Sequence, residues 1–229
     1  MTDIREIAPM PPFTTFDVEQ RSEEWHALRA GLVTGSCAQA ILQQRKRGSG
    51  ELAIRRDLRH RLVCERLTGR SLDRTFRPSE SMEHGIDAEP DAVAAYEVFS
   101  GRAVDRIGFI KHNVIKAGCS PDGIVGAFEG ALECKCPDST THLEYLKAKV
   151  LPEEYFGQVV HTLWLTGAQW VDFVSFDPRF SGPLRLFVKR VHRAEIDVAA
   201  YELALTLFLS EVDAEVEAAA MLAAEVAVA

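Results

Sequence analysis

Residues 103 to 136 limit the possible folds of this chain more than any other stretch. They contain short β-type segments, AVDRIGFI, NVIKAGC, GIVGA and GALECKC, separated by Gly, Asn and Pro. Two helical stretches follow at about 138–149 and 153–165, and then two further β-type segments, VDFVSFD and PLRLFVKRVH. This order favours a sheet covered by helices. We therefore predict a single α/β domain over residues 1–229, with a central mixed β-sheet flanked by helices.

Helical patterns precede the β-rich stretch. Ser22 has the character of an N-cap, and a second helix is expected from about Ser36 to Lys46. A third helix is expected to end at Gly69 after an apolar stripe formed by Ile54, Leu58, Leu62, Val63 and Leu67. A fourth helix is expected from about Ser81 to Phe99, and Pro90 is expected to interrupt it, either as a kink or because the regular part of the helix begins at Glu89.

The two ends of the chain differ from its middle. We expect a proline-rich N-terminal arm over about residues 1–16 and a long acidic amphipathic helix over about 194–229. No apolar run approaches the ~18 residues that a membrane span needs, and the N-terminus lacks the apolar segment of a secretory signal. The five cysteines have no framework spacing. Reduced thiols in a cytoplasmic protein are therefore expected.

Charge is distributed unevenly along the chain. The net charge of −8 argues against a protein that coats nucleic acid non-specifically. Residues 41–80 nevertheless carry eleven Lys and Arg against five acids, whereas residues 194–229 carry eight acids and no Lys or Arg. The first region would attract a phosphate-bearing partner, and we expect it to track a duplex backbone. Basic residues on a helix are also commonly just a solvated face, so charge alone leaves both interpretations open.

The charged residues of the β-rich stretch follow a regular pattern. Asp122 precedes one short segment, and Glu133 and Lys135 lie within the next. Because side chains alternate along a strand, Glu133 and Lys135 would share one face. The other face is apolar and suits a core, with Leu132, Cys134 and Cys136. A hairpin through the intervening glycines would place Asp122 beside Glu133.

Two adjacent carboxylates repel each other unless a cation lies between them. Oxygen ligands without His or Cys suit a hard metal ion, Mg²⁺ or Mn²⁺. Lys135 beside such a metal would orient the attacking water and help to deprotonate it, while the metal would stabilise charge on a phosphoryl oxygen. The alternative is a surface hairpin in which Glu133 and Lys135 form a solvated pair.

The arrangement P-D followed by E-x-K is the signature of the PD-(D/E)XK nuclease superfamily. Within it, the chain closely resembles the phage lambda-type alkaline exonucleases, also called YqaJ-like viral recombinases. The resemblance extends over SEEWHALRAGLVTGS, MEHGIDAEPDAVAAYE, GCSPDGIVG, LECKCP and EEYFGQVVHTLWLTGAQWVDFVSFDPR, in that order. It implies a restriction-endonuclease-like core.

The resemblance also implies roles for individual residues. Asp122, Glu133 and the backbone carbonyl of Cys134 match metal ligands, and Glu89 matches a carboxylate that supports a second metal ion. Lys135 matches the catalytic lysine, and Gln158 matches a glutamine that holds the nucleophilic water. The implied cofactor is Mg²⁺, as two ions, with Mn²⁺ as a substitute.

A second set of residues matches the pocket for the 5′-phosphate of a DNA end. Its members are polar or cationic: Arg29, Ser36, Ser120 and, beside them, Thr34. Further DNA contacts are expected from aromatic and basic side chains: Trp25, Tyr155, Arg45, Lys46 and Arg47.

The function implied by the resemblance is a Mg²⁺-dependent exonuclease. It would degrade the 5′-ended strand of linear double-stranded DNA and leave a 3′ single-stranded overhang. A homotrimeric ring threaded by DNA, a single-strand annealing recombinase as partner, and a phage or prophage origin in a bacterial cytoplasm are also implied. The acidic C-terminal helix and Pro90, directly after Glu89, depart from the family pattern.

Three other functions remain open from the sequence: a PD-(D/E)XK endonuclease, a non-catalytic DNA-end-binding subunit, and a nuclease that acts on RNA. Cys134 and Cys136 have no second pair at zinc spacing and are expected to be structural thiols. His142 and His161 are expected to be packed or solvent-facing rather than to contact DNA.

Overall fold

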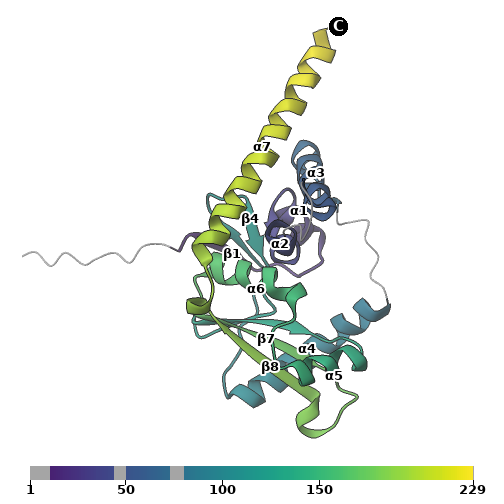
Figure 1. Cartoon of the computed structure of the whole chain (residues 1–229), viewed down its shortest axis with the longest axis vertical. Coiled ribbons are helices and arrows are strands. Elements are labelled where there is room, and N and C mark those ends of the chain that lie inside the picture. Colours follow the sequence, from purple (N-terminus) through teal and green to yellow (C-terminus); the bar gives the residue numbers. More distant parts are fainter. Residues whose placement is uncertain (1–10, 44–49, 73–79, 229) are drawn as a thin grey trace, which may run out of the picture.

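The computed structural model describes residues 11–43, 50–72 and 80–228, which form two four-stranded sheets covered by helices (Figure 1). The first sheet has the order β1-β3-β4-β2 and consists of β1 (Phe13–Phe16), β2 (Val33–Thr34), β3 (Phe109–His112) and β4 (Ala117–Cys119). The second has the order β5-β6-β7-β8 and consists of β5 (Gly123–Val125), β6 (Gly130–Lys135), β7 (Trp170–Phe176) and β8 (Leu186–His192). The strands thus form two sheets where one central sheet was expected.

Both sheets are mixed. In the first, β2 pairs with β4 in parallel and the other pairs are antiparallel. In the second, β6 and β7 are parallel, since α5 (Ser139–Ala148) and α6 (Glu153–Thr166) form the crossover between them. The mixed α/β class predicted from the sequence is confirmed.

Helices cover both faces of the second sheet. On one face, α4 (Glu80–Ser100) packs Ala92, Val93 and Tyr96 against Leu132 and neighbouring side chains. On the other, α5 and α6 contribute aromatic packing, with Tyr145 and Tyr155 against Phe173. The predicted burial of Leu132, Cys134 and Cys136 is confirmed. Glu133 and Lys135 therefore point to the opposite side, toward α6.

Among the described N-terminal helices, one precedes β2 in the sequence and two follow it. Helix α1 (Glu23–Arg29) begins at Ser22, whose side chain accepts a hydrogen bond from the Trp25 backbone N–H, so this predicted N-cap is confirmed. Helix α2 (Gly35–Leu42) ends before the expected boundary at Lys46. Helix α3 (Ala53–Thr68) ends at Gly69 in a left-handed conformation, as predicted. Within its expected apolar stripe, Ile54 and Leu67 are about half exposed, because only the central residues of the stripe face the core.

Pro90 does not interrupt α4, which is one continuous helix from Glu80 to Ser100. The alternative of a regular helix that begins only at Glu89 was therefore wrong, and the alternative of a kink at Pro90 stays a prediction. Packing of the helix against the second sheet on both sides of Pro90, through Ala88 and Ala92, outweighs the loss of one backbone hydrogen bond.

Helix α6 lies very close to α2. A β-carbon on Gly157 would lie 2.4 Å from the backbone nitrogen of Gln39, and the Gly157 N–H donates to the Gln39 side chain at 2.7 Å. Only glycine allows the two backbones to approach this closely. This contact fixes the position of the following residue, Gln158.

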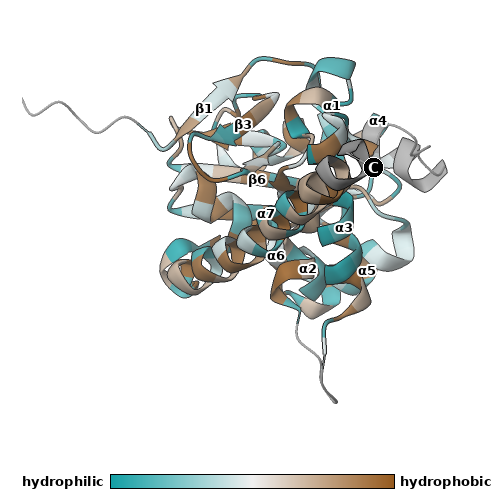
Figure 2. Cartoon of the chain, turned by 90° about the horizontal axis from the view of Figure 1, so that it is seen from above, coloured by the Kyte–Doolittle hydropathy of each residue, from teal (hydrophilic) through white to brown (hydrophobic). Residues whose placement is uncertain are grey.

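The chain ends in helix α7 (Val198–Val228), which packs on the core with its first half and then runs away from the body (Figure 1). Beside it lies the mainly hydrophilic α3 (Figure 2). Two short 3₁₀ turns, η2 (Gly182–Arg185) and η3 (Arg193–Glu195), flank β8. Within the described part of the chain, no helix combines the length and apolarity that crossing a membrane requires.

Candidate active site

The hairpin of β5 and β6 places Asp122 beside Glu133. Gly123 pairs with Leu132, and the Asp122 N–H donates to the Leu132 carbonyl at 3.0 Å. The Asp122 side chain in turn accepts a hydrogen bond from the Cys134 backbone N–H at 2.6 Å. The carboxylate of Asp122 is thus held against the strand that carries Glu133 and Lys135.

Glu133 is only 2% exposed and lies among polar groups of β6 and α6. Its Oε1 accepts a hydrogen bond from Gln158 of α6 at 2.5 Å and pairs with the Lys135 ammonium group. The Lys135 nitrogen also lies 5.3 Å from the centre of the Tyr155 ring. Glu133, Lys135, Gln158 and Tyr155 therefore form one contiguous group on the α6 side of the sheet.

Glu89 approaches from α4, on the other side of the sheet. It is partly buried, and its carboxylate lies 3.8 Å from the guanidinium group of Arg21. Its negative charge acts on both Asp122 and Glu133. Glu89, Asp122 and Glu133 are called the carboxylate cluster below.

Burial and the repulsion between like charges raise pKa values in this cluster. Burial, with a further contribution from Asp122, raises the pKa of Glu133 to about 8, although Lys135 opposes the shift. Burial likewise raises the pKa of Asp122 and of Glu89. For Lys135, burial alone would lower the pKa, but Glu133 and Asp122 raise it overall, so the lysine stays charged.

The donor chemistry of the carboxylate cluster fits a hard divalent cation. Burial raises the pKa of all three carboxyl groups, neighbouring carboxylates raise it further for Glu89 and Glu133, and a cation among them would remove this repulsion. Among the residues described, however, no three His, Cys, Asp or Glu side chains already converge on a common point. Lys135 and Gln158 both contact Oε1 of Glu133, so its second oxygen can take a metal ion while these contacts remain, whereas Glu89 would have to exchange Arg21 for a metal contact.

A second group of side chains, the Arg29 cluster, forms around α1 and β2. Arg29 lies over the Trp25 ring at 3.9 Å and donates to the Thr34 hydroxyl at 3.4 Å. Thr34 shares a hydrogen bond with Ser36 at 3.3 Å, and the Trp25 indole N–H donates to Ser120 at 2.8 Å. The structure thus brings together all members of the cluster: Trp25, Arg29, Thr34, Ser36 and Ser120.

The two clusters are joined through α2. A β-carbon on Gly35 would lie 3.3 Å from Cγ of Gln158, so the start of α2 contacts the glutamine that reaches Glu133. Gly35 lies between Thr34 and Ser36 of the Arg29 cluster. One substrate could therefore contact both groups at once.

Other residues singled out from the sequence lie elsewhere. Arg45, Lys46 and Arg47 fall outside the described residues. His142 and His161 are fully buried, as expected for packed histidines. The Trp164 and Trp170 side chains are also buried.

Part of the basic region, helix α3, lies beside the acidic helix α7. Arg55 pairs with Glu211 at 2.7 Å, Arg59 pairs with Glu215, and Arg66 pairs with Asp213 at 2.7 Å. All three acids belong to α7. The acidic helix thus neutralises three of the arginines that the charge pattern assigned to DNA, because α3 and α7 are neighbours in the fold, and whether the region tracks a duplex stays a prediction.

Two arginines that the sequence analysis did not single out lie close to the carboxylate cluster. Arg21 contacts Glu89, and the charges of Arg21 and Arg106 both act on Glu89 and Asp122. Arg21 adjoins the capping residue Ser22, but no local sequence signal marks its backbone conformation. Arg106 lies in a loop of β-type character, and only the tertiary fold brings it to this site.

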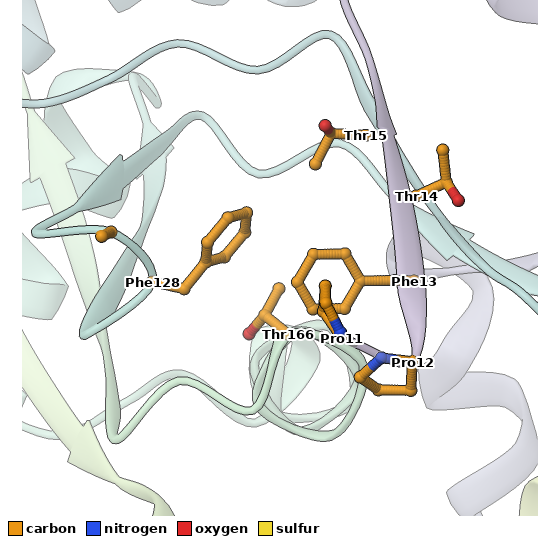
Figure 3. Close-up of a pocket in the computed structure, with 8 residues that line it drawn as sticks. Pro11, Pro12, Phe13, Thr14, Thr15, Phe128 and Thr166 are labelled. Carbon is orange, nitrogen blue, oxygen red and sulfur yellow. The ribbon is translucent and has the colours of Figure 1, made fainter. Parts of the chain in front are cut away.

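A shallow cleft lies outside both clusters, between β1 and the turn that follows β5 (Figure 3). Phe13 and Phe128 face each other across it, with ring centres 5.0 Å apart. Its lining consists of Pro, Phe, Thr and Ala side chains. It offers no titratable group and therefore no acid–base or metal chemistry.

Comparison with known families gives one match. Residues 24–169 match the model of the YqaJ-like viral recombinase domain. This range contains the carboxylate cluster, the Arg29 cluster, Lys135 and Gln158. Among curated proteins, no sequence matches.

Solved structures include close relatives of this fold. The crystal structure of an alkaline exonuclease from Laribacter hongkongensis is 35% identical, with a TM-score of 0.79 over 90% of this chain and 100% of that one. The same exonuclease in complex with dAMP matches with a TM-score of 0.80, at the same identity and coverage. A phage-related exonuclease from Haemophilus somnus 129PT is 17% identical, with a TM-score of 0.59 over 80% of this chain and 96% of that one, and shows a likeness of fold alone. The restriction-endonuclease-like fold class expected from the sequence is confirmed.

Proposed function

Because this chain belongs to the YqaJ-like viral recombinase family, we propose that it is a Mg²⁺-dependent 5′→3′ exonuclease acting on linear double-stranded DNA. It degrades the 5′-ended strand and leaves a 3′ single-stranded overhang. The observation that carries this proposal is the group formed by Asp122, Glu133, Lys135 and Gln158, which unites buried carboxylates, a charged lysine and an amide.

Each side chain of this group has a role in phosphodiester hydrolysis. Asp122, Glu133 and the Cys134 carbonyl would hold one Mg²⁺, and Glu89 would support a second. Bound Mg²⁺, for which Mn²⁺ can substitute, would supply Lewis-acid stabilisation of the phosphoryl oxygens. Lys135 remains charged and lies beside Glu133, so its ammonium group can orient the attacking water and stabilise negative charge that develops on the phosphate.

Gln158 fixes the water from the other side. Its amide N–H₂ donates to Glu133, and its position is set by the close contact of Gly157 with α2. The remaining amide oxygen can accept a hydrogen bond from the water. A water held in this way has already lost most of its freedom of motion, so less entropy is lost on reaching the transition state.

The Arg29 cluster supports the preference for a 5′ end. A guanidinium group flanked by hydroxyl groups suits a terminal phosphate, which carries more negative charge than an internal one. Binding of that phosphate by Arg29, Ser36 and Ser120 would place the first phosphodiester bond near the carboxylate cluster.

The family resemblance further supports a homotrimeric ring, a single-strand annealing recombinase as partner, and a phage or prophage origin with action in the bacterial cytoplasm. Sedimentation of the full chain, alone and with a 3′-overhang DNA, tests the trimer directly.

The function is tested by digestion of three DNA substrates in Mg²⁺: a 5′-phosphorylated linear duplex, a 5′-hydroxyl linear duplex and a closed circle. We expect rapid loss of the phosphorylated 5′-ended strand alone, abolished by Lys135→Ala and unaffected by Lys111→Ala on β3. Cutting of the closed circle would indicate an endonuclease. Binding of ends without digestion would indicate a non-catalytic subunit, and preference for a competing RNA duplex would indicate an RNA nuclease.

A further inference from the structure

Arg21 has an unusual backbone conformation. Its φ is +72°, in the left-handed region that disfavours residues with a β-carbon and that glycine adopts freely. It directly precedes Ser22, the N-cap of α1. The Arg21 side chain is 48% exposed, so burial in a core does not explain an arginine at this position.

The ion pair with Glu89 does not explain it either. The two groups are 3.8 Å apart, and the arginine is half exposed. Solvent-exposed pairs at such distances contribute little to stability, and the left-handed backbone opposes even that contribution. Strain of this kind beside a candidate active site points to a function of the side chain.

A second arginine is held on the same side of the carboxylate cluster. Gly108 approaches Val18 so closely that a β-carbon would lie 2.0 Å from the Val18 carbonyl oxygen. This contact ties the segment before β3 to the segment before α1. This contact thereby brings two arginines to the same region. Arg106, which is exposed, lies two residues before Gly108, and Arg21 lies three residues after Val18.

The positive charges of Arg21, Arg106 and Lys135 all act on Glu89 and Asp122. The contacts differ, however: Lys135 and Gln158 contact Glu133, whereas Arg21 contacts Glu89. The two arginines are also distinct from the Arg29 cluster, in which Arg29 contacts Trp25 and Thr34. DNA that reaches the carboxylates meets strong negative charge, and cations beside them reduce the repulsion.

We infer that Arg21 and Arg106 form a second phosphate-binding site, which takes an internal backbone phosphate of the DNA strand beside Glu89 and Asp122. The inference rests on the proposed function, because it assigns a further contact to the same substrate. A guanidinium group fits a phosphate in a two-pronged arrangement, and Arg21 would exchange Glu89 for DNA when Glu89 turns to a metal ion. The Arg29 cluster keeps the terminal phosphate.

The test measures DNA binding separately from catalysis. Binding of a 5′-phosphorylated duplex is followed by fluorescence anisotropy in Ca²⁺, at a series of salt concentrations, for the full chain and for Arg21→Gly, Arg21→Lys and Arg106→Gln. Each loss of charge should reduce the salt slope of log K by about 0.9 and weaken binding roughly five- to tenfold at low salt. Arg21→Lys should restore most of the slope.

Two further measurements distinguish binding of an internal phosphate from binding of the terminal phosphate and from a structural role of Arg21. The preference for 5′-phosphate over 5′-hydroxyl should be unchanged in Arg21→Gly but lost in Arg29→Gln. The melting temperature of Arg21→Gly should not fall, because glycine relieves the left-handed backbone. Lys149→Gly is the matched control: Lys149 is exposed, has a φ of +56° and ends α5, and its removal should leave DNA binding unchanged.

An unchanged salt slope in Arg21→Gly and Arg106→Gln would overturn the inference. So would a loss of the 5′-phosphate preference in Arg21→Gly, which would assign Arg21 to the terminal phosphate. Tighter Mn²⁺ binding with unaltered DNA binding would show that Arg21 only neutralises Glu89. If the full chain digests no DNA at all, the proposed function itself fails, and the digestion assay reports this independently of the salt slopes.

Discussion

At the scale of single residues, burial decides how polar groups behave in this protein. Glu133 keeps a raised pKa because burial outweighs the charge of Lys135, which suits a group that later binds a cation. Asp172 is equally buried, but it accepts two hydrogen bonds from Arg190, at 2.8 and 2.7 Å, and one from Tyr96, also at 2.7 Å. These partners satisfy its charge, so Asp172 stabilises the sheet and is not available for chemistry.

His161 gives a pH-dependent contribution to stability. It is fully buried, its Nε2–H donates to the Gly118 carbonyl, and the Tyr201 hydroxyl lies against Nδ1. Burial lowers the pKa of His161 from 6.5 to about 4. The unfolded chain takes up the proton near pH 6.5 and the folded chain does not, so this contribution is present above pH 6.5 and is lost as the pH falls toward 4.

The check is a comparison of urea denaturation for the wild type and His161→Gln between pH 7 and pH 4. The free energy of unfolding of the wild type should fall by roughly 3 kcal/mol more than that of the variant across this range. Exposed His192→Gln is the control and should follow the wild type. Parallel curves for the wild type and His161→Gln would show that His161 does not make this contribution.

At the scale of elements, two helix contacts determine the site. Helix α6 is held against α2 at Gly157, and this contact aims Gln158 at Glu133. Helix α7 covers α3, and its acids pair with the α3 arginines. The first contact concerns catalysis, and the second concerns stability and the surface charge that DNA meets.

Gly157→Ala tests the first contact. The new methyl group would overlap the Gln39 backbone, so α6 must move, and we expect a loss of about 1–3 kcal/mol in the free energy of unfolding. Because Gln158 moves with α6, the rate of DNA hydrolysis should fall at least about tenfold at a temperature where the variant is folded. Gly69→Ala is the control: nothing lies near its β-carbon, and its left-handed conformation should cost about 1 kcal/mol without changing the rate. An unaltered rate in folded Gly157→Ala would contradict the role of this contact.

The double variant Glu211→Gln with Glu215→Gln tests the second contact. It removes the α7 partners of Arg55 and Arg59, and each partly exposed pair should contribute up to about 1 kcal/mol to the free energy of unfolding. Among the described residues, both arginines then keep only Glu51 as an ion-pair partner, so they should also increase non-specific DNA binding and steepen its salt dependence. Exposed Glu217→Gln, on the same helix, is the control. If DNA binding is the same in the double variant and the control, α7 does not mask α3.

At the scale of the whole molecule, the sequence predicted what depends on local pattern. The alternation around Glu133 and the adjoining hairpin suffice to place Asp122 beside it, and both features are confirmed in β5 and β6. The N-cap at Ser22 and the end of α3 at Gly69 were predictable for the same reason.

The features that were not predicted depend on contacts between distant segments. The division of the strands into two sheets, the continuity of α4 through Pro90, and the pairing of α3 with α7 all result from tertiary packing. The location of Arg21 and Arg106 beside Glu89 has the same origin, because Gly108 and Val18 meet only in the folded chain. These partners are too far apart in the sequence for a local pattern to indicate that they meet.

The most direct test of the central claim is the single-turnover rate of release of the 5′-terminal nucleotide from a phosphorylated linear duplex in Mg²⁺. Asp122→Asn keeps an acceptor for the Cys134 N–H but removes the charge, whereas Asp57→Asn alters an exposed aspartate on α3. If the carboxylate cluster holds the metal ion, the rate should fall at least about 1000-fold in Asp122→Asn and stay within about twofold in Asp57→Asn. A rate for folded Asp122→Asn close to that of the wild type would contradict the account.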